Sequence, residues 1–494
     1  MGYITATDIY KYFQCPHWPY YDRFATPEEA KLKRPLSEGE KRRLEDGVEH
    51  EQVVVESLYS QRDMTELAPS GDAEKDAAQT LQLMRLGVPI IYQGTLLWGN
   101  RTGRPDILEK REGASALGEW HYVPIDIKST HELEKYQKYQ LAFYSELLKH
   151  TQDKEPEEAA IINADKICLP FDPRGIKDDY AALMADIESL ADGKKPLPVL
   201  RKACLEVGQW GVLCEADAVA KNDIARLYNV DVQKLKALRT LGVRNVADAA
   251  DMSIASLVGA VKGLTEHALE TIKIQAESLE NDSIIVRRPV KLDYPGWEIH
   301  FDIESDPPTG LDYLYGILIK HDGVTEYKAF VAETLEQEHA MWSDFLDWIK
   351  TLPGDYAVYH YSSYELSRLK TLEQRYGGSI WLDYFRDKTV DLKELTKHSI
   401  TYPLHFYGLK NIAKFLGFKW RGDIANGAVS IDRFEQFKAT GDRSILEDII
   451  KYNEDDVLAT AYLKAWLDKY AGAPTIYLPP YPWAAASANK NPFA

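Results

Sequence analysis

The chain has 494 residues and a formal net charge of −18, and 45% of its residues are hydrophobic and 11% aromatic. The length exceeds what one hydrophobic core supports and predicts roughly two to four domains, while the apolar content excludes a disordered protein. The acidic balance excludes a uniformly basic nucleic-acid-binding surface. No basic leader and no run of about 18 uncharged apolar residues occurs, so we expect a soluble, cytoplasmic protein without a membrane span.

Short basic runs remain in this acidic chain. They lie at residues 31–34 and 41–43, and in the pair Arg287 and Arg288. Each run taken alone is most simply explained as the solvated face of a helix. A nuclease would concentrate Asp and Glu around cations, so the net charge does not exclude that class of enzyme.

Shifts in the hydrophobic pattern divide the chain into four parts. Residues 1–220 alternate helical patterns with apolar segments typical of strands, and predict a mixed α/β domain. Residues 221–285 have helical periodicity broken by short glycine turns and predict a helical module. Strand patterns return in residues 286–472, where a strand and its antiparallel neighbour precede alternating helices and strands, so a second α/β domain is expected. Residues 473–494 predict an extended tail.

The first chemical constellation combines two carboxylates and a lysine. Asp106 follows a turn and leads into an apolar segment, and Asp126 and Lys128 lie on one face of a later strand because side chains alternate with period two. Converging carboxylates can hold a hard divalent cation, and a neighbouring lysine can assist an attacking water. The constellation therefore predicts hydrolysis of a phosphodiester. Asp-x-Lys alone is a weak signal, because surface strands often alternate charged residues.

Three more residues accompany this constellation, one before it and two after it in the sequence. His50 lies on a predicted helix upstream, and Gln140 and Tyr144 lie on one face of a helix downstream. With them, residues 1–220 resemble the RecB-type branch of the PD-(D/E)XK nucleases, including the CRISPR-associated RecB-like exonucleases. The resemblance implies a restriction-endonuclease-like fold. It also implies that His50 and the two aspartates ligate Mg²⁺ or Mn²⁺, that the lysine assists the water, and that Gln140 and Tyr144 orient the site and contact DNA. The alternatives are a hydrogen-bonded helix histidine and a pair at the edge of the core.

The four cysteines are too few and too scattered for a disulfide scaffold. Many nucleases of the RecB-like type carry an iron–sulfur cluster held by one early and three late cysteines. Cys15, Cys204 and Cys214 stand where three of these ligands are implied, but Gly208 or Gln209 stands where the middle late cysteine is expected. Cys168 lies in a segment that predicts a core strand, where a buried free cysteine is ordinary. The sequence thus indicates a degenerate cluster site, and an iron–sulfur cluster is doubtful.

The second constellation lies after residue 286. Asp302 and Glu304 lie on one face of a predicted strand, Glu365 lies at a strand-to-helix turn, and Tyr452 and Asp456 lie one helical turn apart. Four acids can hold two cations that stabilise both the attacking water and the leaving oxygen, so the pattern predicts a two-metal site in which the tyrosine orients the water. The alternative is that these acids are solubilising charges on a strand edge and a surface helix.

These motifs make residues 286–472 resemble the DEDD-type 3′–5′ exonucleases of the ribonuclease H-like superfamily, in the subclass that ends in Tyr-x-x-x-Asp. The resemblance implies a ribonuclease H-like fold and Mg²⁺ or Mn²⁺ on the four acids. Glu365 departs from the pattern, because Asp is usual at that position. Residues 221–285 resemble helix–hairpin–helix units, which contact phosphates through backbone amides, and the alternative is a plain helical linker.

The order of these parts resembles a family of RecB-like nucleases whose longer members continue into a helicase. The chain has no G-x-x-x-x-G-K-[ST] motif, so any helicase or ATPase is expected to be a separate subunit. We expect a metal-dependent DNA nuclease that acts as an exonuclease with two active sites. The alternatives are an RNA exonuclease, since no residue predicts recognition of a 2′-hydroxyl, and a non-catalytic nucleic-acid-binding adaptor with a decayed site.

Overall fold

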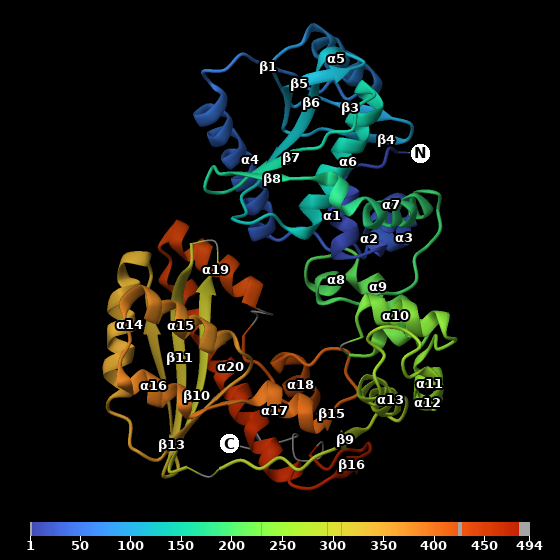
Figure 1. The fold of residues 1–494 in the computed structure, drawn as a ribbon. Helices are drawn as coiled ribbons and strands as arrows, with labels where there is room; N and C mark the ends of the chain where they lie inside the picture. The colour runs from blue at the N-terminus through green and yellow to red at the C-terminus, as the bar shows by residue number, and fades with distance from the viewer. Residues whose placement is uncertain (1, 229, 294, 308, 423–426, 484–494) are drawn as a thin grey trace. The chain divides into compact units, whose positions relative to one another are not determined.

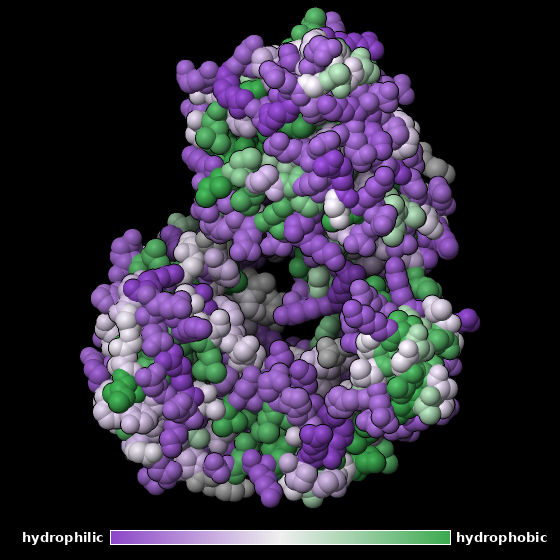
Figure 2. Space-filling model, in the orientation of Figure 1, coloured by the Kyte–Doolittle hydropathy of each residue, from purple (hydrophilic) through white to green (hydrophobic). Residues whose placement is uncertain are grey.

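The computed structural model describes all residues except 1, 229, 294, 308, 423–426 and 484–494. The chain divides into two compact units, Met1–Ala220 and Lys221–Ala494, which run from blue to green and from green to red in Figure 1. Both units contain helices packed around β-sheets, so the predicted mixed α/β multidomain fold is confirmed. Among the described residues, no helix has both the length and the apolar character that a membrane span requires. Hydrophilic side chains cover most of the face shown in Figure 2.

A six-stranded sheet forms the centre of the first unit. Its strands, in sheet order, are β1 (Met64–Glu66), β2 (Ile90–Tyr92), β5 (Ile107–Ser115), β6 (Gly118–Ile127), β7 (Ala159–Ile162) and β8 (Cys168–Phe171). Strands β5 and β6 are antiparallel, whereas β6 and β7 are parallel. A parallel pair needs a crossover connection, and α6 (Lys135–Gln152) supplies it and packs on β6. The sheet therefore places the end of β6 beside the start of β5.

The remaining elements of the first unit lie around this sheet. The helices are α1 (Ala6–Gln14), α2 (His17–Phe24), α3 (Pro27–Ala30), α4 (Glu38–Tyr59), α5 (Ala73–Leu86), α7 (Lys177–Ala191), α8 (Lys202–Glu206) and α9 (Gly211–Ala220), with a 3-10 turn at Pro173–Ile176. A separate hairpin consists of β3 (Leu96–Trp98) and β4 (Arg101–Gly103). The expectation that Cys168 is buried in a core strand is wrong: β8 is one of the two edge strands of this sheet, and Cys168 is exposed.

The second unit begins with the helical module. Its helices are α10 (Val232–Thr240), α11 (Val246–Asp251), α12 (Ile254–Leu257) and α13 (Glu266–Glu280), preceded by a 3-10 turn at Ile224–Arg226. The turns after α10 and before α13 contain Gly242 and Gly263, whose φ angles of 92° and 93° favour glycine. The module leads into β9 (Ile284–Val286), which pairs with β15 (Ile400–Thr401) and β16 (Thr475–Tyr477). The described part of the predicted tail thus contributes a strand, and residues 484–494 lie outside the described residues.

A five-stranded sheet forms the centre of the rest of the second unit. Its strands, in sheet order, are β12 (Val324–Val331), β11 (Leu311–His321), β10 (Trp297–Asp306), β13 (Tyr356–His360) and β14 (Thr389–Asp391). Its helices are α14 (Leu335–Ile349), α15 (Tyr364–Tyr376), α16 (Ile380–Asp387), α17 (Leu392–Ser399), α18 (Leu409–Leu416), α19 (Gly427–Thr440) and α20 (Arg443–Tyr470). Strands β10 and β11 are antiparallel, as the sequence predicts.

The two faces of β10 have different neighbours. Ile299, Phe301 and Ile303 belong to the same hydrophobic core as Phe345 of α14, and the Phe301 and Phe345 rings lie 5.8 Å apart. Because side chains alternate along a strand, the even-numbered residues of β10 point to the opposite face. Helix α20 packs against β10 and β11, on the side of the sheet away from α14 in Figure 1. The acids of β10 therefore face α20.

Candidate active sites

Three carboxylates converge between β10 and α20 in the second unit. Asp302 and Glu304 come from the strand and Asp456 from the helix, and their ligand oxygens all lie within 4.8 Å of one another. Glu304 and Asp456 are buried, and Asp302 is partly exposed. Carboxylates this close repel one another unless a proton or a cation lies between them. The cluster, which we call the β10–α20 acid cluster, therefore has the arrangement of a cation site.

The ionisation of these acids reflects that repulsion. Burial, together with the neighbouring carboxylates, raises the pKa of Asp302. Burial and the charge of Asp456 raise the pKa of Glu304 to about 8. Burial also raises the pKa of Asp456, and the Lys410 ammonium opposes this increase. A divalent cation would offset the repulsion, and hard oxygen donors of this kind fit Mg²⁺ or Mn²⁺.

A glycine on β11 allows α20 to approach the cluster. Gly316 pairs with Asp302 across the two strands, and a Cβ atom at this position would overlap the side-chain oxygen of Asn453 on α20. The Asn453 amide nitrogen donates to an Asp302 carboxylate oxygen at 2.7 Å. The close approach of helix to strand thus fixes the orientation of the first acid.

The other two acids also have fixed partners. The indole nitrogen of Trp420 donates to an Asp456 oxygen at 2.7 Å. The Tyr313 hydroxyl lies 3.4 Å from Glu304 and 2.9 Å from the Ser430 hydroxyl. Such partners hold each carboxylate in one orientation, as metal ligands require.

Lys410 of α18 lies beside Tyr452, and the sequence motifs did not indicate it. Its ammonium donates to the Tyr452 hydroxyl at 2.6 Å and lies 4.1 Å from the centre of the tyrosine ring. Burial lowers the pKa of Lys410, while the charges of Asp456 and Glu304 oppose that change. The lysine therefore positions the tyrosine hydroxyl next to the acid cluster.

Glu365 stands apart from these three acids. It is buried at the start of α15, and one of its carboxylate oxygens lies 3.4 Å from Nδ1 of His360. Its charge is one of several that raise the pKa of Asp302. The structure thus brings together Asp302, Glu304 and Asp456. Among the described residues, Glu365 does not belong to the group whose ligand oxygens all lie within 4.8 Å of one another.

In the first unit, Lys128 lies between two aspartates. Its ammonium is 2.7 Å from Asp126 and 3.9 Å from Asp106, and the amide of Ile127 donates to Asp106 at 2.6 Å. Burial and the charge of Asp126 raise the pKa of Asp106. Burial lowers the pKa of Lys128, but the two aspartates outweigh this and raise it overall. We call these three residues the β5–β6 site.

Glu51, which the sequence motifs did not single out, is connected to this site. One of its oxygens accepts hydrogen bonds from Tyr92 at 2.8 Å and from Gln93 at 2.5 Å, and the same Gln93 amide lies 3.4 Å from Asp106. The charge of Glu51 contributes to the raised pKa of Asp106. Glu51 is therefore a further carboxylate at the β5–β6 site, brought there by the turn that contains Gln93.

His50, the neighbour of Glu51 on α4, has a buried Nε2 that makes no hydrogen bond within the described part of the chain. Among the described residues, the ligand atoms of His50, Asp106 and Asp126 do not all lie within 4.8 Å of one another. A buried nitrogen without a hydrogen-bond partner is nevertheless consistent with a ligand role. His50 therefore stays a predicted ligand.

The two predicted residues of α6 are both buried. The Gln140 amide nitrogen donates to the carbonyl of Ala6 at 2.9 Å, and its side-chain oxygen has no partner among the described residues. Burial and the charges of the two aspartates raise the pKa of Tyr144. Tyr144 and Arg104 line a cavity of about 460 Å³ beside the site. This cavity offers space for a substrate group next to the carboxylates.

The predicted cysteines come together near the start of the chain. The sulfur atoms of Cys15 and Cys214 lie 3.2 Å apart, and Cys204 contacts Cys15, whose pKa it affects. Buried His17 provides a nitrogen within 4.8 Å of both Cys15 and Cys214 sulfurs. Cys204 is outside this group of ligand atoms within 4.8 Å of one another; together with it, the donors would be three thiols and an imidazole, a set that fits a structural Zn²⁺ ion. The sequence pattern did not indicate His17, because the family's cluster ligands are all cysteines.

The residues at the missing-cysteine position have other roles. A Cβ atom on Gly208 would lie 2.7 Å from the carbonyl oxygen of Cys204, so backbone fills the place of a side chain. The Gln209 amide donates to the carbonyl of Arg34 at 2.9 Å. Neither residue is therefore available as a ligand in this conformation.

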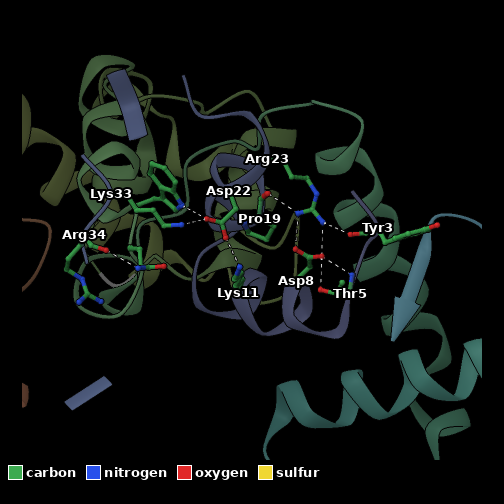
Figure 3. A network of polar contacts seen from close by, with 11 residues as sticks. Tyr3, Thr5, Asp8, Lys11, Pro19, Asp22, Arg23, Lys33 and Arg34 are labelled. Atoms are coloured by element: carbon green, nitrogen blue, oxygen red, sulfur yellow. Dashed lines mark hydrogen bonds and ion pairs between the residues drawn. The ribbon is translucent and has the colours of Figure 1, made fainter. Parts of the chain in front are cut away.

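A network of ion pairs holds the cysteine-bearing segments together (Figure 3). Asp22 of α2 accepts from Lys11 at 2.6 Å, from Lys33 at 2.8 Å and from the Trp210 indole at 2.9 Å. Trp210 lies between Cys204 and Cys214 in the sequence, so these contacts connect the early and late cysteine segments. The charge of Lys33 is thus compensated within the protein.

One comparison with known proteins bears on the β10–α20 acid cluster. A family model of the RNase H superfamily matches residues 299–468, a range that contains all the acids predicted for the second site. Residues 299–468 form a ribonuclease H-like domain. No curated protein matches the chain, and the family match does not include residues 1–220. Domains of this superfamily are usually metal-dependent nucleases, so a nuclease-type function and a divalent metal are supported for the second unit.

Proposed function

We propose that this protein is a metal-dependent DNA exonuclease whose ribonuclease H-like domain shortens strands from the 3′ end. The observation that carries the proposal is the convergence of Asp302, Glu304 and Asp456 within the matched domain. Bound Mg²⁺ or Mn²⁺ would supply Lewis-acid stabilisation of the developing charge and lower the pKa of water. Asn453 and Trp420 would hold two of the acids in place.

Tyr452 has the role of orienting the attacking water. Its hydroxyl accepts a hydrogen bond from Lys410, so the hydroxyl proton is left to donate to a water or a carboxylate. Glu365 contributes a further negative charge near Asp302, and one of its carboxylate oxygens lies 3.4 Å from Nδ1 of His360. A rotation of this side chain toward the cluster would complete the set of four acids.

We propose a second, independent active site in the first unit, of the RecB-like type. Asp106 and Asp126 would bind the cation together with His50 or Glu51, and Lys128 would assist the water. The support is the contact of Lys128 with both aspartates and the adjoining cavity. DNA is the favoured substrate because the first unit resembles DNA nucleases. A separate helicase subunit would supply single strands, and the helical module would contact phosphates through its glycine turns.

The test uses end-labelled single- and double-stranded DNA and RNA with Mg²⁺, Mn²⁺ or EDTA. The proposal predicts cation-dependent shortening of DNA that is lost in the double variant Asp126→Asn, Asp302→Asn. Cleavage of RNA alone would favour an RNA exonuclease. Binding of nucleic acid without cleavage under any of these conditions would favour an adaptor with decayed sites.

A further inference from the structure

A cavity lined by basic residues lies within the second unit, between α13 of the helical module and the segment formed by β9, α17 and β15. Its volume is about 320 Å³. The basic and imidazole side chains on its wall are Lys234, His267, Arg287, Arg288, Lys397 and His398. None of the described residues that line it is an aspartate or a glutamate. In a chain with a net charge of −18, such a wall is an unusual concentration of positive charge.

Two of these charges lack an acidic partner. A terminal nitrogen of Arg287 donates to the backbone carbonyl of Lys397 at 2.6 Å, and its Nε is buried without a hydrogen-bond partner among the described residues. Arg288 is exposed and forms no ion pair within the described ranges. By contrast, Lys234 pairs with Asp231 at 2.8 Å, and Glu394 pairs with both Lys397 and His398.

A half-buried guanidinium without a carboxylate is costly. Burial lowers the pKa of Arg287, and the charge of Arg288 lowers it further. Removing a cation from water destabilises the fold unless an anion compensates the charge. The cavity therefore has the charge and the unused donors that a bound anion would satisfy.

Neutral polar side chains line other parts of the cavity, and the Thr271 hydroxyl among them donates to the carbonyl of His267 at 2.9 Å. Thr271 and Gln275 line the cavity from α13, and they lie on one face of the helix because they are four residues apart. Tyr228 and Tyr407 also line it, with ring centres 4.2 Å apart and nearly parallel planes. The donors for a phosphate are therefore the guanidinium groups of the two arginines, whose planar arrangement of N–H groups is suited to phosphate oxygens.

A short segment connects the cavity to the β10–α20 acid cluster. Tyr407 lines the cavity, and Lys410, three residues later, contacts Tyr452 at the acids. Three residues span at most about 11 Å. The Tyr361 hydroxyl, just after β13, donates to the carbonyl of Tyr407 at 2.6 Å and fixes this segment. A phosphate in the cavity would thus lie within a few nucleotides of the acids.

We infer that this cavity binds the phosphate groups of a nucleic-acid strand whose 3′ end occupies the acid cluster, with Arg287 and Arg288 as the principal contacts. The inference rests on the proposed nuclease function and names the path of its substrate. The pair Arg287 and Arg288 is then a binding site and not merely a solvated basic surface.

The test measures 3′-end shortening of a labelled single strand of about 12 nucleotides. The background carries Asp126→Asn, so that only the second site acts. For this strand, the double variant Arg287→Gln, Arg288→Gln should raise KM about tenfold and change kcat much less. For a dinucleotide, which is too short to reach the cavity, the same variant should raise KM less. The matched control is Lys350→Gln, a lysine at the end of α14 that is paired with exposed Asp347 and does not line the cavity.

A binding measurement separates this inference from the proposed function. In an Asp302→Asn background, anisotropy of a fluorescent strand is followed against NaCl concentration. Loss of two phosphate contacts to a single strand should reduce the slope of log affinity against log salt by about 1.4, and Arg288→Gln alone by about 0.7. Arg288 is exposed, so the single variant tests the inference even if the double variant unfolds. Inorganic phosphate and a mononucleotide serve as competitors.

The outcomes are distinct. If the parent cleaves DNA and the arginine variants have the parent's KM and salt slope, the cavity inference is overturned and the proposed function stands. If no preparation cleaves nucleic acid but the slope falls as expected, the proposed function fails and the cavity is still a strand-binding site. Equal displacement by inorganic phosphate and by the 12-nucleotide strand, at equal phosphate concentration, would mean that the cavity binds a free anion, and would also overturn the inference.

Discussion

The two carboxylate sites differ in how their negative charge is compensated. In the first unit, the ammonium of Lys128 lies 2.7 Å from Asp126 and close to Asp106. In the second unit, the ligand oxygens of three acids lie within 4.8 Å of one another, and the Lys410 ammonium donates to the Tyr452 hydroxyl beside them. A site that contains its own cation is held together without metal, whereas a cluster of acids depends on one. We therefore expect the two sites to respond differently to substitution, pH and divalent metal.

The largest effect is expected from removing an acid at the centre of the cluster. Asp302→Asn should reduce 3′-end shortening by roughly a thousandfold, because it removes a ligand, whereas Tyr452→Phe should cost about tenfold, because it only misaligns the water. Both are measured as kcat/KM in an Asp126→Asn background. Equal losses in the two variants would contradict the distinction between ligand and orienting group.

Lys128 tests the other side of the comparison. Lys128→Ala should reduce the first unit's activity by about a hundredfold, since the substitution removes both the group that assists the water and the charge that holds two aspartates together. Cleavage is measured with the second site disabled by Asp302→Asn. Lys110 lies on β5 outside the site, with its ammonium donating to the carbonyl of Gly87, and Lys110→Ala serves as the control. Full activity of Lys128→Ala would rule out the proposed role.

Glu365 sharpens the description of the second site. Glu365→Ala should reduce 3′-end shortening by roughly a hundredfold, and Glu365→Asp should retain part of the activity, because the shorter side chain keeps the charge that faces Asp302. If the alanine variant is as active as its parent in the Asp126→Asn background, then Glu365 is not the fourth acid, and three acids are sufficient.

The dependence of stability on pH should also distinguish the sites. The pKa of Glu304 is raised from 4.5 to about 8, so the folded state binds a proton that the unfolded state releases. The contribution of Glu304 to stability without metal should therefore be fully present below about pH 4.5 and be lost as the pH rises toward about 8. Melting in EDTA should show a decrease on the order of 10 °C in the second unit's transition over this range. Mn²⁺ should restore the Tm. Glu304→Gln should reduce the slope but not remove it, because the pKa values of Asp302 and Asp456 are also raised; a slope unchanged in that variant would contradict the assignment.

The smallest effect on cleavage is expected at the cysteines. With Cys15, Cys204, Cys214 and His17 as donors, the purified protein should be colourless and contain about one zinc ion per chain. Cys214→Ser and His17→Ala should each lose the zinc and lower the Tm while changing kcat by less than about twofold. An absorbance band at about 400 nm, with iron and sulfide in stoichiometric amounts, would show that the site holds an iron–sulfur cluster instead.

Local periodicity predicted much of the arrangement at the two sites. Alternation along a strand was sufficient to place Asp302 beside Glu304, and Asp126 beside Lys128, because period two does not depend on distant packing. Helical spacing likewise placed Tyr452 near Asp456. The antiparallel pairing of β10 and β11 also followed from the pattern of the two segments.

Contacts that depend on tertiary packing were not predictable in this way. Glu51 reaches Asp106 through Gln93, whose φ of 59° belongs to a turn that no periodicity indicates. Lys410 reaches Tyr452 only because α18 packs on α20. The position of Glu365 against His360 depends on how α15 begins after β13. In each case the sequence contains the residue, but the fold selects its partner.

The most direct measurement of the central claim follows the products of the Asp126→Asn protein acting on a 5′-labelled single DNA strand. In this protein only the β10–α20 acid cluster remains. We predict a ladder of fragments shortened progressively from the 3′ end in Mn²⁺, no cleavage in EDTA, and no cleavage in Mn²⁺ once Asp302→Asn is added. A ladder that persists in EDTA or in the Asp302→Asn protein would show that the acid cluster is not a nuclease site.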